Sequence, residues 1–149
     1  MADHSLTIAP PERMAFRHPL AIRVTDVNHG GHMGNERVLM YCQEARAALL
    51  AAMGGDEGDI HGAGVIVVDA RILFMAEGFA GDVLTISVGV DDYRRSSCDF
   101  FYELMRDHDG RTIARARTRI VFFDYARRRV VRMPASFRER LPVISPQQN

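Results

Sequence analysis

The densest group of chemically active side chains lies between Asp26 and Glu36. This segment reads DVNHGGHMGNE and holds one aspartate, one glutamate, two asparagines, two histidines and three glycines. An imidazole can donate or accept a proton near neutral pH, and glycine lets backbone N–H groups approach a ligand closely. The segment therefore predicts a site that polarises a carbonyl group and activates water.

The single residues of this segment have different expected roles. His32 is the first candidate for hydrogen-bond donor or general base, and Asn28 and Asn35 are expected to position water or a carbonyl group. Asp26 completes the polar set, and Glu36 is a reserve base. Each also has a structural interpretation, because histidine and asparagine are common in turns, asparagine caps helices, and first-turn carboxylates favour the helix dipole.

The histidines and cysteines do not predict a metal site or a cofactor. His29 and His32 match no zinc spacing, and no third ligand accompanies them. Cys42 and Cys98 have no partner spacing, so neither a zinc ribbon nor a disulfide framework is expected. Cys42 also lies within an apolar stretch, where a nucleophilic thiolate would be disfavoured.

A helix is predicted directly after the polar segment, over residues 36–53. No glycine or proline interrupts this run, and apolar residues recur at three- and four-residue steps. Asn35 is the expected N-cap, and Gly54 with Gly55 ends the helix. Leu39 and Met40 widen the apolar stripe, which predicts a central helix buried on several sides. Glu44, two turns along, is a second reserve base whose structural interpretation is an ion pair.

The start of this helix is the expected oxyanion site. The first N–H groups of a helix have no intrahelical acceptor and stand at the positive end of its dipole. The backbone of Met33 and Gly34, with the amides up to Glu36, is therefore expected to supply the donors.

The rest of the chain predicts strands. A short strand is expected over residues 20–25, and four more over 65–75, 83–90, 98–105 and 112–125, with a turn at 107–110. Residues 1–16 are expected to be a loose arm and 142–149 a frayed tail. The order predicts a single α+β domain, with a core over about 16–141, in which one antiparallel sheet wraps one helix. Pairing of two sheets edge to edge in a homodimer is the natural expectation.

Two of these strands carry opposite charges. Asp99 and Glu103 share one face of one strand, and three arginines share one face of the next: Arg115, Arg117 and Arg119. A basic stripe could bind a polyanion, but acidic partners across a hairpin favour a structural ladder of ion pairs.

Composition excludes several classes of protein. Nineteen acidic residues balance nineteen basic ones, which argues against a general nucleic-acid binder. Every basic residue other than histidine is arginine, so Schiff-base catalysis and a P-loop lysine are excluded. No serine lies in a G-x-S-x-G elbow. Neither a signal peptide nor an apolar run of membrane-spanning length is present, so no membrane partner and a cytoplasmic location are expected.

Four motifs resemble the hot-dog-fold thioesterases of the 4-hydroxybenzoyl-CoA thioesterase-like group. They are Val24-Thr25-Asp26-x-Asn28, Gly31-His32-Met33-Gly34-Asn35, Glu44-Ala45-Arg46 and Glu77-x-Phe79-x-Gly81-Asp82. The resemblance implies the hot-dog fold, active sites between protomers of a homodimer or homotetramer, and hydrolysis of an acyl-CoA. Asp26 is similar to the first Asp of the family's D-x-D pattern. Asn28 replaces the second, which often supplies the catalytic carboxylate, and an amide cannot act as a base.

The resemblance has further implications for the site. His32 and Asn35 are similar to the histidine and the final asparagine of the family's G-H-V-N-N variant, whereas Val38 replaces a frequent tyrosine and is expected to alter the acyl pocket. Because coenzyme A carries phosphates, the turn Arg94-Arg95-Ser96-Ser97 is expected to bind substrate, with Arg127-Arg128-Arg129 as a second candidate.

Two alternative functions remain open. The loss of the second Asp allows a non-catalytic acyl-CoA or acyl-carrier binding module. Asp26-x-Asn28 followed by a histidine also resembles the D-x-N-x-x-H motif of hot-dog hydratases, but His32 lies one residue too late.

Overall fold

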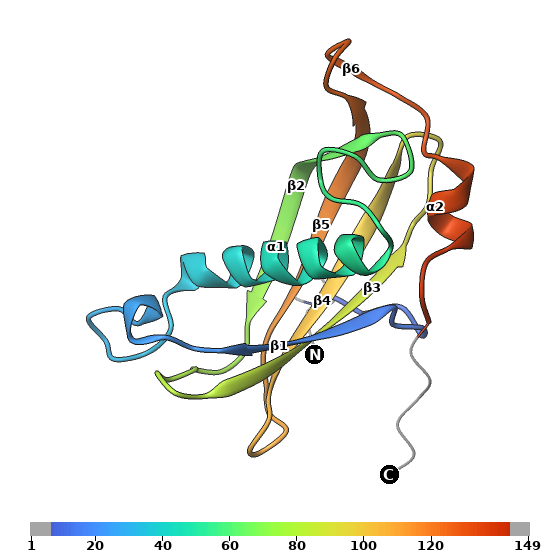
Figure 1. The fold of residues 1–149 in the computed structure, drawn as a ribbon. Coiled ribbons are helices and arrows are strands. Elements are labelled where there is room, and N and C mark those ends of the chain that lie inside the picture. Colours follow the sequence, from blue (N-terminus) through green and yellow to red (C-terminus); the bar gives the residue numbers. More distant parts are fainter. Residues whose placement is uncertain (1–6, 144–149) are drawn as a thin grey trace.

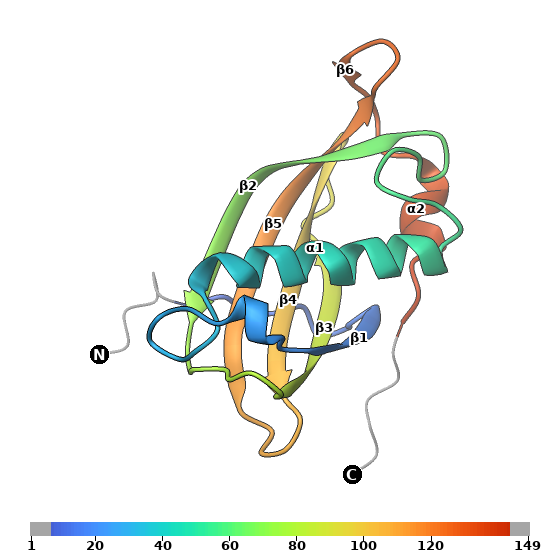
Figure 2. The same cartoon turned by 60° about the vertical axis from the view of Figure 1, so that its left-hand side comes forward.

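One long helix lies across the concave face of a curved antiparallel sheet. The computed structural model describes residues 7–143. The elements in chain order are β1 (Phe16–Ala21), the 3₁₀ turn η2 (Val24–Asp26), α1 (Asn35–Ala52), β2 (Gly64–Phe74), β3 (Val83–Asp91), β4 (Ser97–Arg106), β5 (Thr112–Asp124), β6 (Arg129–Val130) and α2 (Ala135–Glu139). The strand order is β1-β3-β4-β5-β2, with β6 paired to β5 (Figures 1 and 2). This confirms the predicted α+β hot-dog fold.

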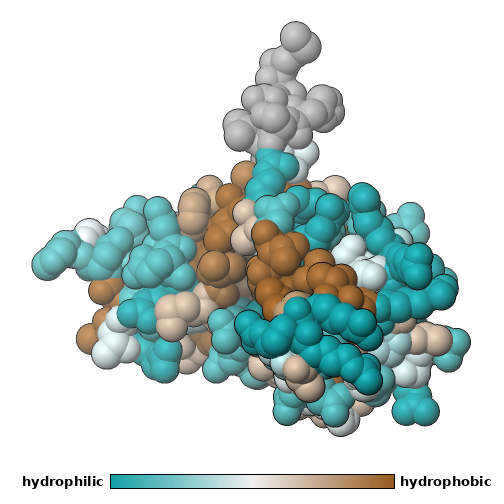
Figure 3. Space-filling view, turned by 90° about the horizontal axis from the view of Figure 1, so that it is seen from above, coloured by the Kyte–Doolittle hydropathy of each residue, from teal (hydrophilic) through white to brown (hydrophobic). Residues whose placement is uncertain are grey.

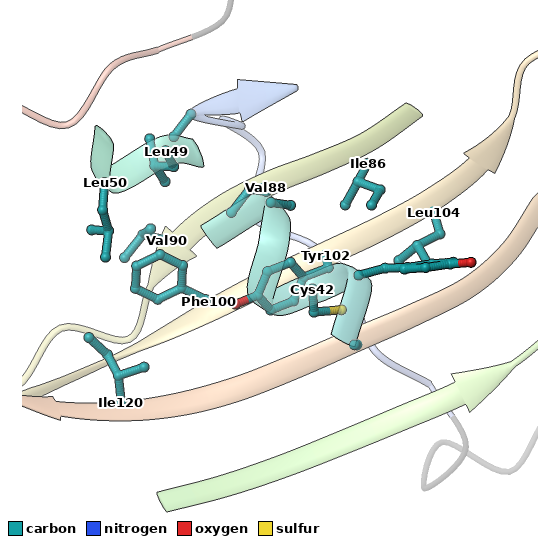
Figure 4. Packing of buried hydrophobic residues seen from close by; sticks show 14 of the residues in the cluster. Cys42, Leu49, Leu50, Ile86, Val88, Val90, Phe100, Tyr102, Leu104 and Ile120 are labelled. Carbon is teal, nitrogen blue, oxygen red and sulfur yellow. The ribbon is translucent and has the colours of Figure 1, made fainter. Parts of the chain in front are cut away.

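The core forms between the inner face of the sheet and one face of α1. Cys42 and Leu49 from the helix pack against Val88, Phe100 and Tyr102 from the central strands (Figure 4). Residues that alternate along a strand point to the same side, which explains how the predicted alternation of apolar residues produces this layer.

The helix is less enclosed than its apolar sequence predicts. Leu39 and Met40 are 40% and 48% exposed, so the expectation of burial on several sides was wrong. The helix also begins at Asn35, with Gly34 in the N-cap position, rather than after an Asn35 cap. Gly34 is extended, and its carbonyl already accepts the Arg37 N–H, which closes the first turn one residue early. Gly54, at a positive φ of 86°, ends the helix as predicted.

The first strand and the chain ends also differ from the prediction. The expected strand over 20–25 lies at Phe16–Ala21, because hydrogen bonds between Arg23 and Asp26 fold the next residues into η2. Val24, which falls within the expected strand over 20–25, lies in η2 and is 81% exposed. The short α2 was not predicted.

The predicted loose arm is ordered over its described part. Ile8 is buried, the Ala15 N–H donates to the Val88 carbonyl, and Gly89 leaves room for Pro11 on the outer face of the sheet. Residues 1–6 and 144–149, the rest of the predicted arm and most of the predicted tail, lie outside the described residues.

The predicted charge ladder is confirmed on the outer face of the sheet. Arg119 and Arg115 lie directly opposite Asp99 and Glu103, and the ion pairs are 2.7 and 2.8 Å long. Arg117 binds Asp99 from the other side at 3.1 Å. The three arginines are therefore paired with carboxylates of the same sheet, as expected for a structural ladder of ion pairs.

Within residues 7–143, β2 is an edge strand with one unpaired side, and it carries exposed apolar side chains. Val67, Val68 and Phe74 on this strand and Met75 just beyond it are exposed. Figure 3, a view from above Figure 1, shows apolar surface between hydrophilic ends of the molecule. A free edge strand with apolar side chains favours pairing with another strand.

Candidate active site

The polar segment 26–36 folds into a tight loop that leads into α1. Asn28 closes the loop: its side-chain oxygen accepts the Gly30 N–H at 3.0 Å, and its backbone N–H donates to the His32 carbonyl at 2.9 Å. Val27 and Met33 form an isolated bridge across the base of the loop. The loop lies at one end of the molecule (Figure 1), with Asn28 and His29 exposed and His32 half-buried.

Asp26 is the buried anchor of this loop. Its carboxylate accepts hydrogen bonds from the Tyr41 hydroxyl at 2.7 Å and from the backbone and side chain of Arg23 at 3.1 Å, and its carbonyl accepts the Gly34 N–H at 3.0 Å. Burial acts to raise the pKa of Asp26, but the hydrogen bonds from Tyr41 and Arg23 outweigh it and lower the pKa below its ordinary value. The side chain is buried and its oxygens are occupied, so Asp26 holds the loop against the helix.

A small pocket of about 250 Å³ lies beside the start of α1. It is lined by His32, Met33, Asn35, Phe74, Met75, Ala76, Glu77 and Ile113. The polar groups belong to the loop, the first residue of the helix and the segment after β2. The remaining wall is apolar, so one pocket combines groups that can act on a carbonyl with space for an apolar acyl group.

The neighbours of the two ring nitrogens of His32 define which nitrogen carries the proton in the neutral ring. Nδ1 lies 3.3 Å from the Met33 carbonyl, so this nitrogen is the one that donates in the neutral ring. Nε2 is then left with a lone pair and lies 3.9 Å from the Glu77 carboxylate. In a neutral His32, Nε2 is therefore a hydrogen-bond acceptor beside Glu77.

The backbone N–H donors at the start of α1 differ in whether they already have a hydrogen-bond acceptor. The Met33 N–H donates to the Gly78 carbonyl at 2.7 Å, and the Gly34 N–H donates to Asp26. These two predicted oxyanion donors are therefore engaged. The N–H groups of Asn35 and Glu36, in the first turn of α1, have no acceptor within residues 7–143, as expected for helix-start donors.

The other predicted residues lie further from the pocket. The Glu36 carboxylate folds back over Gly34 and lies 3.7 Å from Arg37. Glu44 is exposed in a groove between β1 and α1 and pairs with His18 at 3.3 Å, which agrees with its structural interpretation. The turn 94–97 joins β3 to β4, at the end of the sheet opposite the 26–36 loop (Figure 1).

Two polar residues near the helix were missed by sequence reasoning. Buried Arg46 bonds Glu57 at 2.8 Å and the Tyr102 hydroxyl at 2.9 Å, which ties α1 to the loop before β2 and to β4. Glu77 lines the pocket, although sequence reasoning assigned it no role beyond its place in a motif. Arg46 and Glu77 both lie within motifs that resemble the thioesterase family. This resemblance is the sequence signal that could have identified them.

Within residues 7–143, no group of three or more metal-ligating side chains is found, and no helix there has the length and apolar character needed to cross a membrane.

Comparison with known proteins identifies the family of this chain. Residues 22–141 match the Thioesterase-like superfamily, and the chain belongs to it. A comparison with curated proteins found no match.

Solved structures share the fold at low sequence identity. The chain is similar to a 1,4-dihydroxy-2-naphthoyl-CoA thioesterase from Synechocystis, with a TM-score of 0.76 and 20% identity over 85% of this chain and 94% of the other. It is also similar to a variant of 4-hydroxybenzoyl CoA thioesterase complexed with 4-hydroxybenzoyl CoA, with a TM-score of 0.75 and 22% identity over 85% and 97%. A third structure, BH1999 gentisyl-coenzyme A thioesterase, gives a TM-score of 0.73 and 18% identity over 83% and 99%.

Proposed function

We propose that the chain is an acyl-CoA thioesterase that hydrolyses its substrate by direct attack of water, without a covalent intermediate. The observation that carries this proposal is the pocket at the start of α1, where His32 and Asn35 stand beside an apolar wall that includes Phe74. Family membership and the CoA-thioester substrates of related structures support the same reaction. The preferred acyl group is expected to be apolar or aromatic, since most of the pocket wall is apolar.

The proposed reaction needs donors for the carbonyl and a base for water. The free amides of Asn35 and Glu36 would donate to the thioester oxygen as it gains negative charge. The water oxygen, held by His32, attacks the carbonyl carbon while one of its protons passes to a base in the pocket. The tetrahedral intermediate then collapses, the C–S bond breaks, and the proton returns to the departing thiolate. The products are a carboxylic acid and a free thiol.

Asp26 and Asn28 have supporting roles in this proposal. Asp26 positions the loop, because its carboxylate is buried and already bonded. Asn28 keeps the turn closed through Gly30, and its side chain is exposed.

We also propose that two chains pair through their free β2 edges. An antiparallel pair related by a two-fold axis brings the start of one β2 beside the end of the other. The start of β2 lies next to the β5–β6 hairpin, since Gly64 pairs with Phe123 and contacts Tyr125. The arginines at 127–129 of a second copy would thereby approach the pocket, which itself contains no arginine.

The same pairing bears on the predicted substrate-binding turn. Arg94, Arg95, Ser96 and Ser97 lie between β3 and β4, further from the β2 edge in the strand order. The 127–129 hairpin is consequently the better placed of the two candidates for the phosphates of coenzyme A.

The test is thiol release from a panel of short, long and aromatic acyl-CoAs. Wild-type protein is expected to turn over, and His32→Ala is expected to lose about 10²–10³-fold in kcat. His108→Ala, a change at an exposed histidine in another turn, is the matched control. Tight acyl-CoA binding without turnover would instead establish a binding module, and loss of enoyl absorbance without free thiol would establish a hydratase.

A further inference from the structure

One carboxylate lines the pocket. Within residues 7–143 the acidic side chains near the helix mouth are Asp26, Glu36 and Glu77, and of these only Glu77 belongs to the pocket wall. Asp26 is buried and bonded, and Glu36 is turned back over Gly34. Glu77 is 63% exposed, so its carboxylate is accessible to water and substrate.

The backbone on both sides of Glu77 is fixed. Its own carbonyl accepts a hydrogen bond from Arg106 at 2.9 Å, and the next carbonyl, of Gly78, accepts the Met33 N–H at 2.7 Å. The second bond joins the segment after β2 to the residue that follows His32. Gly78 allows this close approach, because a Cβ there would lie 2.6 Å from Ile22 Cδ1. The fold therefore holds Glu77 and His32 side by side.

The separation of the two side chains suits a shared water molecule. His32 Nε2 and Glu77 Oε1 are 3.9 Å apart, which is too long for a direct hydrogen bond. A neutral His32 bonded through Nδ1 offers only a lone pair at Nε2, and a carboxylate also offers only lone pairs. One water, donating a proton to each, can bridge such a gap.

We propose that Glu77 is a catalytic residue that shares the attacking water with His32 and takes up its proton. The inference rests on the proposed thioesterase function and supplies the carboxylate that Asn28 cannot provide. As the water oxygen bonds to the thioester carbon, one of its O–H bonds breaks and the proton moves to the Glu77 carboxylate, while His32 holds the second hydrogen. When the C–S bond breaks, the protonated Glu77 gives this proton to the thiolate sulfur, which restores the carboxylate and leaves the acid and the thiol.

The experiment compares kcat and KM for wild type, Glu77→Gln and Glu77→Ala on the best substrate of the panel. Glu77→Gln is expected to lower kcat about 10²–10³-fold with KM nearly unchanged, because it removes a base and preserves size. Glu139→Gln, a change at an exposed glutamate on α2, is the matched control and should keep wild-type kinetics. All variants are checked by circular dichroism and thermal unfolding.

Chemical rescue separates a base from a structural group. Added formate should raise the activity of Glu77→Ala in a concentration-dependent manner and leave Glu77→Gln and wild type unchanged, because only the alanine variant has room for it. Full activity of Glu77→Gln, beside an inactive His32→Ala, would overturn the role of Glu77 while the thioesterase function stands. A low activity of Glu77→Ala that formate does not raise would also overturn it. Absence of wild-type turnover on every substrate would overturn both proposals.

Discussion

The hydroxyl of Tyr41 donates a 2.7 Å hydrogen bond to the buried carboxylate of Asp26, fifteen residues earlier in the chain. This bond joins the middle of α1 to the turn that precedes the candidate site. Burial and the Asp26 hydrogen bond both raise the pKa of Tyr41, so the hydroxyl stays a donor across the neutral range. The pair fixes the direction in which the loop enters the helix.

Removal of the hydroxyl should therefore cost stability. Tyr41→Phe is expected to lower the free energy of unfolding by about 1–3 kcal/mol, the typical cost of leaving a buried charged group with one hydrogen bond fewer. Denaturant unfolding at pH 7 measures this change. A variant as stable as wild type would show that water replaces the hydroxyl at Asp26.

The Asp26 carboxylate should make stability depend on acid pH. Its pKa is lower in the folded protein than the ordinary value of 3.8, so folding favours the ionised form. Its contribution is complete above the unfolded pKa and is lost as the pH falls through the lower folded pKa. Asp26→Asn should thus be most destabilising at pH 7, with a difference from wild type that shrinks below about pH 4. A difference that stays constant with pH would contradict this linkage.

The two cysteines should be unreactive in the folded protein. Burial raises the pKa of Cys42 to about 12 and also raises that of Cys98. Ellman's reagent at pH 8 is expected to label neither thiol until denaturant is added, and both afterwards. Rapid labelling of native protein would show that the core opens, and it would add a background to thiol-release assays.

A methyl group at Gly78 should separate the two side chains of the pocket. Gly78→Ala would place its Cβ 2.6 Å from Ile22 Cδ1 and 3.3 Å from Ile113 Cδ1, so either these buried side chains or the segment after β2 must shift. The expected result is a loss of about 1–3 kcal/mol in stability and a fall in kcat of about tenfold or more, because misplacement of catalytic groups by about 1 Å is costly. Gly110→Ala, a change in the turn between β4 and β5, is the control for strain away from the pocket. Unchanged kcat in Gly78→Ala would argue against a fixed spacing of Glu77 and His32.

Subunit mixing tests the proposed β2-paired dimer. His32→Ala and a variant with alanine at Arg127, Arg128 and Arg129 should each be weakly active alone. After unfolding and refolding together, up to about a quarter of wild-type activity should return, because half the dimers are mixed and one of their two sites is intact. If the arginines serve the site of their own chain, mixing restores nothing.

The sequence predicted those parts of the fold that depend on local contacts. The strands β2 to β5 and the body of α1 follow from apolar periodicity, and the Asp99–Arg119 pair follows from counting residues across one hairpin. The first strand was misplaced, because alternation continued through Val24 although the Arg23–Asp26 bonds bend the chain.

Long-range contacts account for what was missed at the site. Glu77 meets His32 only because Met33 bonds Gly78, a contact between segments 45 residues apart in the numbering. The engagement of the Met33 and Gly34 amides depends on the same packing. By contrast, His32 and Asn35 line the pocket as a segment at a helix mouth would be expected to do.

The bonds that place the 26–36 loop are separate from the side chains at its tip. Asp26, Tyr41 and the bridge at Val27 and Met33 hold the base, and the Asn28 side chain closes the turn through Gly30, while His29 at the tip is exposed. Substitutions at the tip should consequently be tolerated by folding even where they change chemistry. The loop is thus a suitable position for libraries that seek new acyl or thiol specificities, with the anchoring residues kept constant and only the tip and the pocket wall varied.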